Sequence, residues 1–524
     1  MTPPLKRLPL SIVAVIGAWL GFSNPALHFP PLVLLFPAGI CGQALLASGK
    51  KNAFYWGFFT GAAAVAGCLY WVAYPIHYYG YLPWLLAAPC PVLIGLIVGL
   101  YTGLFAVFAH VAGKRLSWPW FGLFCGPAWV LLYEYAKGMP LFEFPWLLLP
   151  AAFSPWPLFL QAASLVGVYG VSALLAMAGC WLGAAWVRYL EKRRLAALPL
   201  VPALAIVAAL LAFGAVRFHD PITVDATAKM GIVQGNIDQS QKWNKEYQMG
   251  TVRRYMLHTG KLAKQAAFDV VIWPETSMPF YFQEKNDMSA ALKRFAKDTA
   301  TPLLFGAPGY GQNQEKGSED LYNRAYLVDN QGMIDSWYDK EHLVPFGEYV
   351  PYQDFLPFIR HLTASIGDFS PGERTAPLRS GDLAMGMLIC YESIFPRIAQ
   401  KRVAAGANVL VNISNDAWFG RTSAPRQHLE LTVLRAIELN RYIVRSTNTG
   451  ISAFVDPKGR ILEQSPLFET VAMGLDVGLL SKTTVFFGIR DYVLPAMGIL
   501  AVALFVLALA RPVRPGEPQP ETKA

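Results

Sequence analysis

The strongest constraint on how this chain can fold is the near absence of charge from its first 216 residues. Between Met1 and Tyr133 the only charged residues are three basic pairs, at 6–7, 50–51 and 114–115, and only three of the chain's 35 acidic residues precede Arg217. The whole sequence is 54% hydrophobic and 15% charged. So little charge over so long a segment is typical of a membrane domain, and most of the remaining chain is polar enough to form a separate domain.

A helix needs about 20 apolar residues to cross the hydrocarbon layer of a membrane. Seven stretches of about this length precede residue 217, and an eighth lies near the end of the chain. They run at about 8–23, 29–48, 54–75, 83–110, 118–136, 158–187, 197–215 and 490–510. We therefore expect a membrane domain at 1–216 with seven transmembrane helices, a separate domain at 217–488, an eighth helix at 489–511 and a tail at 512–524.

The lysine and arginine residues predict the orientation of these spans, because positive residues concentrate in short cytoplasmic loops. With eight spans, the three basic pairs, the cluster at 188–194 and the arginines at 511 and 514 fall on one side, while the opposite connections carry only Lys137. Both termini are then cytoplasmic, and the domain at 217–488 lies outside. A cleaved signal peptide is the alternative for the first span, but no clear small-x-small site follows it. The net charge of +9 does not indicate nucleic acid, because its clusters lie at span ends.

The domain at 217–488 alternates short apolar runs with amphipathic segments. Strands are expected at 230–234, 270–273, 303–306, 325–328, 385–389, 409–411 and 452–455, and helical spacing occurs at 246–267, 287–299 and 427–441. This alternation predicts one α/β domain with layered sheets and helices.

Cys390 is the first candidate for chemistry, because it ends the apolar run at 385–389 and is followed by polar residues. Side chains at strand ends are held by the sheet yet remain accessible. Cysteine is also among the most buried residue types, however, and often acts as a small hydrophobe. That second interpretation fits the cysteines in the apolar runs, which are Cys41, Cys68, Cys90, Cys125 and Cys180. For Cys390 both interpretations stay open.

Two further strand ends carry an acid and a lysine. Glu275 follows a short apolar run and Pro274, which restricts the backbone, and Lys340 lies in a charged segment at 337–348 with an apolar centre. The alternative for Glu275 is an exposed carboxylate in a turn. The alternative for the segment at 337–348 is a run of charged residues on the surface. Together with a cysteine, the two residues form a workable catalytic set, in which a thiolate attacks, a carboxylate takes its proton and an ammonium stabilises the oxyanion.

Three ordered motifs resemble a known superfamily. Trp-Pro-Glu at 273–275, the segment from Lys340 to Glu348 and Ile-Cys-Tyr-Glu at 389–392 resemble the carbon–nitrogen hydrolase, or nitrilase-like, superfamily. With seven spans before this domain and one after it, the chain from about 8 to 510 resembles the bacterial apolipoprotein N-acyltransferases. The segments 412–420 and 445–448 also resemble that family.

The resemblance implies a polytopic membrane domain with an inserted αββα sandwich. It implies these site residues: Glu275 as general base, Lys340 as charge stabiliser, Cys390 as nucleophile, Glu348 as support for the lysine or for a proton step, and Tyr391 and Glu392 as residues that shape the site. Trp243 is expected near the entrance. Glu134, Lys137 and Glu143 are candidates for binding the donor headgroup, although the acids could equally be solvated at the interface.

The reaction implied by the resemblance is acyl transfer at the periplasmic face of the bacterial inner membrane. The acyl donor is a phospholipid, most simply at sn-1 of phosphatidylethanolamine, and the acceptor is the N-terminal amine of the S-diacylglyceryl-cysteine of an apolipoprotein. No cofactor is implied, and no metal is expected because paired histidine ligands and CxxC motifs are absent from the sequence. Nothing demands an oligomer, so we expect a monomer. The apolar run at 349–366 is a candidate interfacial arm, with an ordinary packed loop as the alternative.

Two other functions compete with this one. A membrane-tethered nitrilase-like amidase or hydrolase would use the same three residues with water as acceptor, but it needs one anchor rather than eight spans. A lipid carrier without catalysis would leave the cysteine, glutamate and lysine set without a use. The products formed from the donor would separate these functions.

Overall fold

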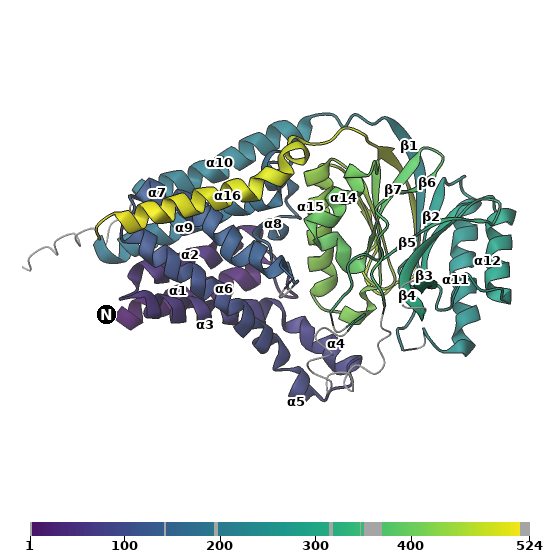
Figure 1. The fold of residues 1–524 in the computed structure, drawn as a ribbon, viewed down its shortest axis with the longest axis horizontal. Helices are drawn as coiled ribbons and strands as arrows, with labels where there is room; N and C mark the ends of the chain where they lie inside the picture. Colours follow the sequence, from purple (N-terminus) through teal and green to yellow (C-terminus); the bar gives the residue numbers. More distant parts are fainter. Residues whose placement is uncertain are drawn as a thin grey trace, which may run out of the picture. The chain divides into compact units, whose positions relative to one another are not determined.

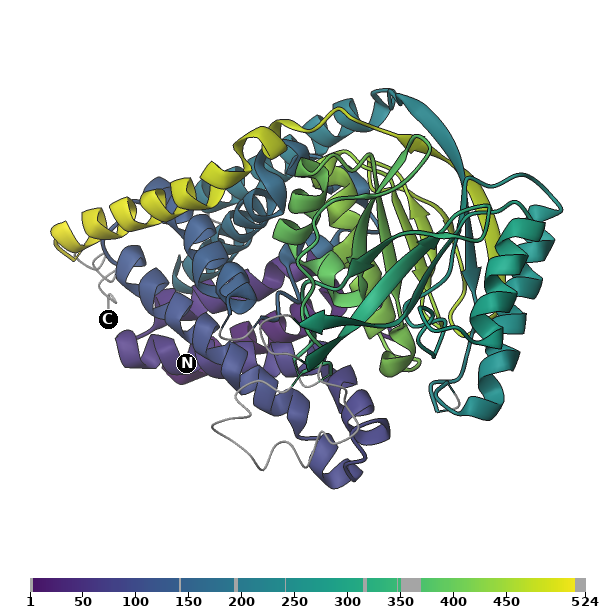
Figure 2. The same cartoon turned by 45° about the vertical axis from the view of Figure 1, so that its right-hand side comes forward.

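A computed structural model describes residues 3–140, 143–192, 197–240, 242–313, 318–345, 347–349 and 369–513. The chain divides into two compact units, each of which is described by itself (Figures 1 and 2). The helical unit comprises Met1–Tyr70, Pro89–Ala215 and Ile489–Ala524, and the sheet unit comprises Trp71–Ala88 and Val216–Gly488.

The helical unit is built from apolar helices joined by short connections (Figure 1). Its long helices are α1 (Pro3–Gly21), α2 (Leu35–Leu46), α3 (Lys50–Cys68), α6 (Cys90–Gly113), α7 (Trp118–Trp129), α9 (Ala163–Lys192), α10 (Ala197–His219) and α16 (Val485–Ala510). Short helical turns occupy Pro30–Leu34, Val130–Tyr135, Ala136–Gly138, Leu149–Ala152 and Pro157–Leu160. The turn at Val130–Tyr135 is π-helical, a local widening that is frequent at functional sites.

Four helices among the described residues have the length and composition needed to cross a membrane. They are Trp84–Gly113, Ala163–Glu191, Leu198–His219 and Val485–Ala510. Lys50–Cys68 and Tyr70–Tyr78 meet the same criteria of length and composition only when they are taken together as one bent helix pair. The helices Arg7–Gly21 and Pro30–Leu46 are apolar but shorter. The expected span at about 118–136 is divided between α7 and the π-helical turn. The count of eight spans therefore stays a prediction, although each predicted stretch contains helix.

Glycines allow the closest helix packing in this unit. A Cβ atom at Gly61 of α3 would lie 1.9 Å from the hydroxyl of Thr102 in α6, and one at Gly99 of α6 would lie 2.7 Å from a carbonyl oxygen of α3. The Thr102 hydroxyl donates a hydrogen bond to the Gly57 carbonyl at 2.9 Å. Small residues and such hydrogen bonds are the usual means of helix association where lipid removes the hydrophobic driving force.

The sheet unit contains two six-stranded sheets. The first has the order β12-β1-β2-β3-β4-β5, and the second has the order β11-β10-β9-β8-β7-β6. The strands of the first sheet are β1 (Ala226–Gln234), β2 (Val270–Ile272), β3 (Leu303–Asn313), β4 (Ser318–Val328), β5 (Ile334–Asp339) and β12 (Val471–Leu479). Those of the second are β6 (Leu378–Ser380), β7 (Leu383–Ile389), β8 (Val409–Ser414), β9 (Ile443–Thr447), β10 (Ala453–Val455) and β11 (Ile461–Gln464).

Helices cover the outer faces of both sheets, which gives four layers (Figure 1). One apolar core lies between the sheets and includes Met230, Ile272, Met387 and Val411. A second core packs α11 (Lys245–Ala263) and α12 (Asp287–Asp298) on the first sheet, while α14 (Pro396–Ala404) and α15 (Ala424–Leu439) cover the second. The unit is thus an α/β domain of layered sheets and helices, as the sequence predicts.

One segment that the sequence assigns to the ends of two spans packs with the sheet unit instead. The segment Trp71–Ala88 holds the short helices α4 (Ala73–Tyr78) and α5 (Trp84–Ala87). The Trp71 indole donates to the Gln427 side chain at 3.0 Å, and the Tyr79 hydroxyl donates to the Ala417 carbonyl at 3.1 Å. These hydrogen bonds join residues more than 300 positions apart, so no local pattern could reveal them.

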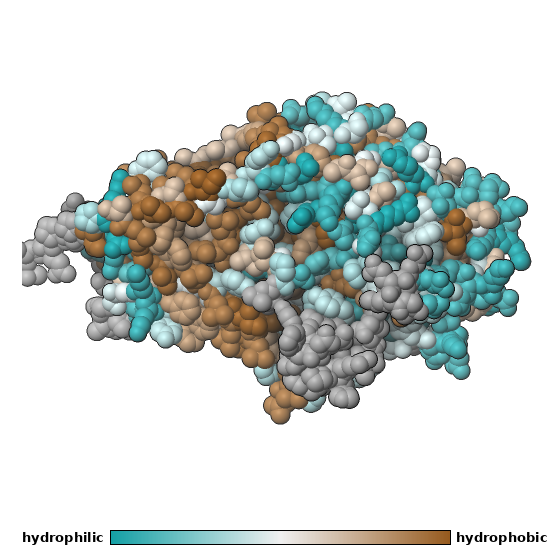
Figure 3. All heavy atoms as spheres, viewed as in Figure 1, coloured by the Kyte–Doolittle hydropathy of each residue, from teal (hydrophilic) through white to brown (hydrophobic). Residues whose placement is uncertain are grey.

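The surfaces of the two units differ in character. Figure 3 shows hydrophobic residues gathered over the helical unit and hydrophilic residues over the sheet unit. On α10 and α16, Leu204 is 63% exposed and Ile499 is 73% exposed. Large apolar side chains exposed along whole helices indicate that this unit is surrounded by lipid.

Candidate active site

Three strand ends supply the predicted catalytic residues. Glu275 follows β2, Lys340 follows β5 of the same sheet, and Cys390 follows β7 of the other sheet. Proline at 274 and the turn after β2 prevent that strand from continuing, while Cys390 begins a 3₁₀ turn, Cys390–Ile394. The hydrogen bonds described below link these three ends, so the site lies where the two sheets present them together.

Lys340 and the two glutamates form one buried cluster. The Lys340 ammonium lies 3.4 Å from Glu275 Oε1 and 2.8 Å from Glu348 Oε2. Asn323, in β4, donates its side-chain amide to Oε1 of both glutamates, at 2.7 Å in each case. All four side chains are buried. Glu348 is therefore the closer counter-ion of Lys340. Asn323 fixes the positions of both carboxylates, because it donates a hydrogen bond to each of them.

Glu275 is positioned by groups from three segments. Its Oε1 accepts from Asn323 and Lys340, and its Oε2 accepts from the backbone amide of Asn415 at 2.9 Å. Asn415 directly follows β8 of the second sheet. This amide therefore ties the carboxylate of one sheet to a strand end of the other, which fixes the direction in which Glu275 can accept a proton.

The charge environment keeps Lys340 protonated. Burial by itself lowers the pKa of a lysine, but Glu348 and Glu275 outweigh it and raise the pKa of Lys340 above its usual value. An ammonium held in this way is a fixed positive charge at neutral pH. It can stabilise an oxyanion that develops beside it.

Cys390 occupies a backbone conformation that cysteine rarely adopts. Its φ is +50°, in the left-handed region, at the sharp turn from β7 into the 3₁₀ helix. Burial of the sulphur raises the pKa of the Cys390 thiol, and the negative charge of Glu275 raises it further, while Lys340 opposes them. The resting side chain is therefore a thiol, and a base must remove its proton before it can attack.

Glu392 joins the turn after β7 to the segment after β5. Its Oε1 accepts from the Tyr338 hydroxyl at 2.7 Å and from the backbone amides of Glu341 at 2.7 Å and His342 at 3.1 Å. Its Oε2 accepts from the amide of Ile389 at 2.6 Å. A single buried carboxylate thus fixes the spacing between the segments that carry Lys340 and Cys390.

A second polar network supports the backbone of Cys390. His428 lies 3.1 Å from the Cys390 carbonyl through Nε2 and 3.3 Å from Asp416 through Nδ1. Arg445 donates to the other oxygen of Asp416 at 2.8 Å. Burial would raise the pKa of Asp416, but Arg445 and His428 lower it well below its usual range, so Asp416 is ionised. This network gives the strained turn a rigid support.

The remaining predicted residues of the sheet unit lie in two different environments. Tyr391 is 8% exposed and packs against Phe395 with 5.1 Å between the ring centroids. Trp243 is 52% exposed. Its neighbour Lys242, by contrast, is buried and donates to the Glu275 carbonyl at 3.3 Å, and burial lowers the pKa of Lys242 to about 8. The sequence pattern indicated the tryptophan of this segment, whereas the buried residue that contacts Glu275 is the neighbouring lysine.

The predicted headgroup residues belong to the helical unit. Glu134 is fully buried, and its Oε1 accepts from the Leu149 amide at 2.9 Å and from the Trp129 indole at 3.3 Å. Lys137 is 2% exposed and donates to the Trp146 carbonyl at 2.7 Å. Glu143 is partly buried at a backbone φ of +49°. Glu134 and Lys137 thus serve internal contacts here, and a headgroup role stays a prediction. Residues 350–366, which are all of the candidate arm except Tyr349, lie outside the described residues.

Sequence reasoning missed several residues that position the site. They are Lys242, Asn323, Tyr338 and His428. Asn323 lies in β4 but two residues before the strand expected at 325–328, so no local signal identified it. Lys242 and Tyr338 lie beside residues that the sequence did single out, but only the fold shows that they and His428 reach the three strand ends.

Family models match both units. The carbon–nitrogen hydrolase model matches residues 229–481, and the apolipoprotein N-acyltransferase N-terminal domain model matches residues 16–181. Among solved structures, the chain is similar to an amidase from Nesterenkonia sp. AN1, with 18% identity and a TM-score of 0.37 over 51% of this chain and 98% of that chain.

Curated relatives cover nearly the whole chain. The apolipoprotein N-acyltransferase of Geobacter metallireducens is 37% identical over 91% of this chain and 90% of its own length. The enzyme of that name from Nitrosomonas europaea is 32% identical over 96% of both chains. Because both units and their order are matched at this identity, the chain belongs to the apolipoprotein N-acyltransferase family.

Proposed function

We propose that this chain transfers a fatty acyl group from a phospholipid, through a thioester at Cys390, to the N-terminal amine of S-diacylglyceryl-cysteine in apolipoproteins. The observation that carries the proposal is the buried cluster of Lys340, Glu275 and Glu348 beside a protonated thiol. Membership of the family and the apolar helical unit on the same chain support a lipid-linked substrate pair.

In the first half-reaction, Glu275 takes the thiol proton of Cys390, and the thiolate attacks the ester carbonyl of the donor. The carbonyl oxygen becomes an oxyanion beside the Lys340 ammonium. When the intermediate collapses, the carbon–oxygen bond breaks and the proton held by Glu275 passes to the leaving oxygen. The products are a lysophospholipid and a fatty-acyl thioester on Cys390.

In the second half-reaction, the free amine of the acceptor attacks the thioester carbonyl. Glu275 accepts a proton from the attacking amine, Lys340 again stabilises the oxyanion, and the carbon–sulphur bond breaks. The thiolate is then reprotonated and the amide product leaves. Because one product departs before the second substrate reacts, the expected kinetics are ping-pong.

Supporting roles follow from contacts. Glu348 is proposed to hold Lys340, Tyr391 and Glu392 to shape the site beside Cys390, and Trp243, which is exposed, to lie at its entrance. We propose that Glu134, Lys137 and Glu143 bind the headgroup of the donor only in a conformation in which their present contacts within the helical unit are broken. We take the enzyme to act as a monomer.

The proposed setting is the bacterial inner membrane. Eight spans would place both termini in the cytoplasm and residues 217–488 in the periplasm, in agreement with the distribution of lysine and arginine. The donor would be the sn-1 chain of phosphatidylethanolamine. Both substrates are lipid-anchored, so a site at the outer face could receive them without exposing whole acyl chains to water.

The test is mass spectrometry of the full chain, purified in detergent and incubated with phosphatidylethanolamine but no acceptor. We expect a fatty-acyl mass on the peptide that carries Cys390. Adding a diacylglyceryl-cysteine peptide should remove that mass from the enzyme and place it on the peptide's amine. The variant Cys390→Ala, measured beside Cys68→Ala, should abolish both events, while the control keeps them.

Two outcomes would contradict the proposal. Release of free fatty acid without an N-acylated peptide would indicate a hydrolase that uses water as acceptor. N-acylated peptide formed by the Cys390→Ala variant would show that transfer does not pass through the thiol.

A further inference from the structure

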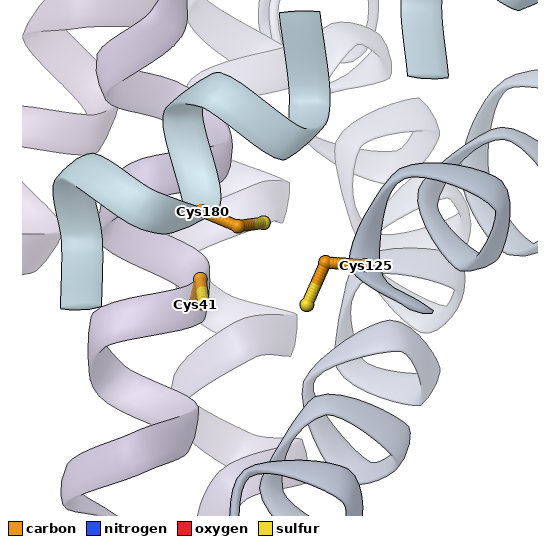
Figure 4. Close-up of side chains that lie close together, drawn as sticks. All are labelled: Cys41, Cys125 and Cys180. Carbon is orange, nitrogen blue, oxygen red and sulfur yellow. The ribbon is translucent and has the colours of Figure 1, made fainter. Parts of the chain in front are cut away.

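Three cysteines of the helical unit lie together, far in sequence from one another. Cys41 of α2, Cys125 of α7 and Cys180 of α9 project into the same space between their helices (Figure 4). Their sulphur atoms all lie within 4.8 Å of one another, and each residue is 0% exposed. Thiols of this unit have no part in the reaction proposed above, so this cluster needs its own explanation.

Close helix packing brings the three thiols together. A Cβ atom at Gly183 of α9 would lie 2.2 Å from a carbonyl oxygen of α2, and one at Gly126 of α7 would lie 2.6 Å from a carbonyl oxygen of α9. These glycines flank the cysteines by one to three positions in sequence. The backbones on either side of the cluster are therefore already in contact, and the sulphur positions are well restrained.

The three residues also lie at one depth. Cys41, Cys125 and Cys180 are each eight to ten residues from the basic residues that end their segments at 50, 115 and 188. Within the helices, Cys41 lies five positions before the end of α2, Cys125 seven after the start of α7 and Cys180 eight before Arg188, or about 7–12 Å at about 1.5 Å per residue. The cluster thus lies well inside the apolar part of its unit, away from water.

We propose that these cysteines bind one thiophilic metal ion, Cu(I), in trigonal coordination. Three points no more than 4.8 Å apart have a centre at most about 2.8 Å from each of them. A thiolate–metal bond of the length found for zinc is about 2.3 Å. Each sulphur would need to move by only about half an ångström, which a change in a side-chain torsion provides.

The number of donors selects the ion. Among the described residues, the group that could hold a metal contains these three cysteines and no fourth histidine, cysteine, aspartate or glutamate. Structural zinc sites have four protein ligands, and three-ligand zinc sites complete their coordination with water, which the apolar and fully buried surroundings of these cysteines disfavour. Soft sulphur ligands without oxygen or nitrogen donors favour Cu(I).

Charge favours the same ion. A Cu(I) ion that replaces one thiol proton leaves the site with no net charge, whereas a divalent ion would have to displace two protons to do so. Burying net charge in apolar surroundings is costly, so the monovalent ion fits this position better. Binding should release a proton, because a metal-binding thiolate must first be deprotonated.

The test measures copper binding by the full chain in detergent, under ascorbate, with the chelator bathocuproine disulfonate as competitor. We expect about one copper per chain and an X-ray absorption spectrum with three sulphur neighbours at about 2.3 Å. Affinity should fall at least ten-fold in each of Cys41→Ser, Cys125→Ser and Cys180→Ser. It should also rise with pH, as proton release requires.

The chain supplies its own matched controls. Cys68→Ser, Cys90→Ser and Cys390→Ala remove the other thiols one at a time and should leave copper binding unchanged. Retention of copper by the triple variant of the cluster would overturn the proposal. So would a wild-type spectrum with fewer than three sulphur neighbours, and this second measurement needs no variant to fold.

Discussion

Each unit of this protein buries a lysine near a glutamate, and the two pairs are held in different ways. In the sheet unit, Lys340 lies within 3.4 Å of carboxylates from two segments, and Glu275 accepts hydrogen bonds from residues 48, 65 and 140 positions away. In the helical unit, Lys137 and Glu134 find their partners between residues 129 and 149. The first pair is a product of tertiary structure, and the second is largely local.

The difference shows what gives a buried lysine and glutamate a chemical use. Both lysines donate hydrogen bonds to buried acceptors, as buried charges must. In the sheet unit, Glu275 and Lys340 lie close enough to the Cys390 thiol, which follows β7, for their charges to shift its pKa. A buried glutamate or lysine is therefore informative about catalysis when its position is set by long-range contacts and a reactive group lies beside it.

The largest expected effect separates the two lysines. Lys340→Met should slow formation of the acyl-enzyme by about 10³-fold, because it removes the charge that stabilises the oxyanion and leaves two carboxylates uncompensated. Lys137→Met should change that rate by less than about ten-fold while lowering the melting temperature, since it leaves Glu134 buried. The rate is measured by single-turnover kinetics and the melting temperature by thermal unfolding. Both are measured for the two variants and for Lys401→Met as a control.

If Lys137→Met lost as much rate as Lys340→Met at an unchanged melting temperature, the distinction between the two lysines would be wrong. It would place the pair of the helical unit in the reaction itself.

The second prediction concerns the glutamates and pH. Glu275→Gln should reduce transfer by about 10²–10⁴-fold by removing the general base. The same change should make Cys390 more reactive to iodoacetamide, because Glu275 raises the pKa of the thiol. In the wild type the labelling rate should still be rising at pH 10, where an ordinary cysteine with a pKa of about 8.5 has levelled off.

Glu134→Gln is the matched control and should leave both the transfer rate and the labelling profile unchanged. Mass spectrometry of the Cys390 peptide between pH 6 and 10 gives the profile. A wild-type plateau below pH 9 would show that the thiol is not held in its protonated form.

The third prediction tests the asparagine that links the two carboxylates. Asn323→Ala should reduce transfer by about 10- to 100-fold, because hydrogen bonds to charged groups contribute about 1.5–3 kcal/mol. Asn330→Ala, at an exposed position in the turn that follows β4, should have no effect. If the rate is unchanged in Asn323→Ala, Lys340 alone suffices to place Glu275.

The smallest expected effect is at Tyr338. Tyr338→Phe removes one of three donors to Glu392 Oε1 and should cost about 1 kcal/mol, or about a five-fold decrease in rate. Tyr326→Phe also removes a buried hydroxyl, which donates to Gln283 at 2.9 Å, but it leaves Glu392 untouched. A rate loss of the same size in both variants would show that Glu392 does not set the spacing of the site.

The three strand-end residues could be predicted because their signals are local. An apolar run followed by Pro274 and Glu275, or by Cys390, can be recognised from adjacent residues alone. Asn323 could not be predicted in this way, because its place depends on how β4 pairs with the strand end after β5. The amide of Lys340 donates to the Asn323 carbonyl at 2.9 Å, and this pairing aligns their side chains.

The sequence by itself determined the apolar composition of the helical unit, the layered α/β nature of the sheet unit and the three residues that the proposed reaction uses. These are properties of neighbouring residues, which periodicity and charge reveal. Only the tertiary structure decided that Trp71–Ala88 packs with the sheet unit, that Asn323, Glu392 and His428 support the site, and that three cysteines from separate helices meet. Hydrogen bonds and helix packing act between segments that are distant along the chain, so their partners are specified only when the whole chain has folded.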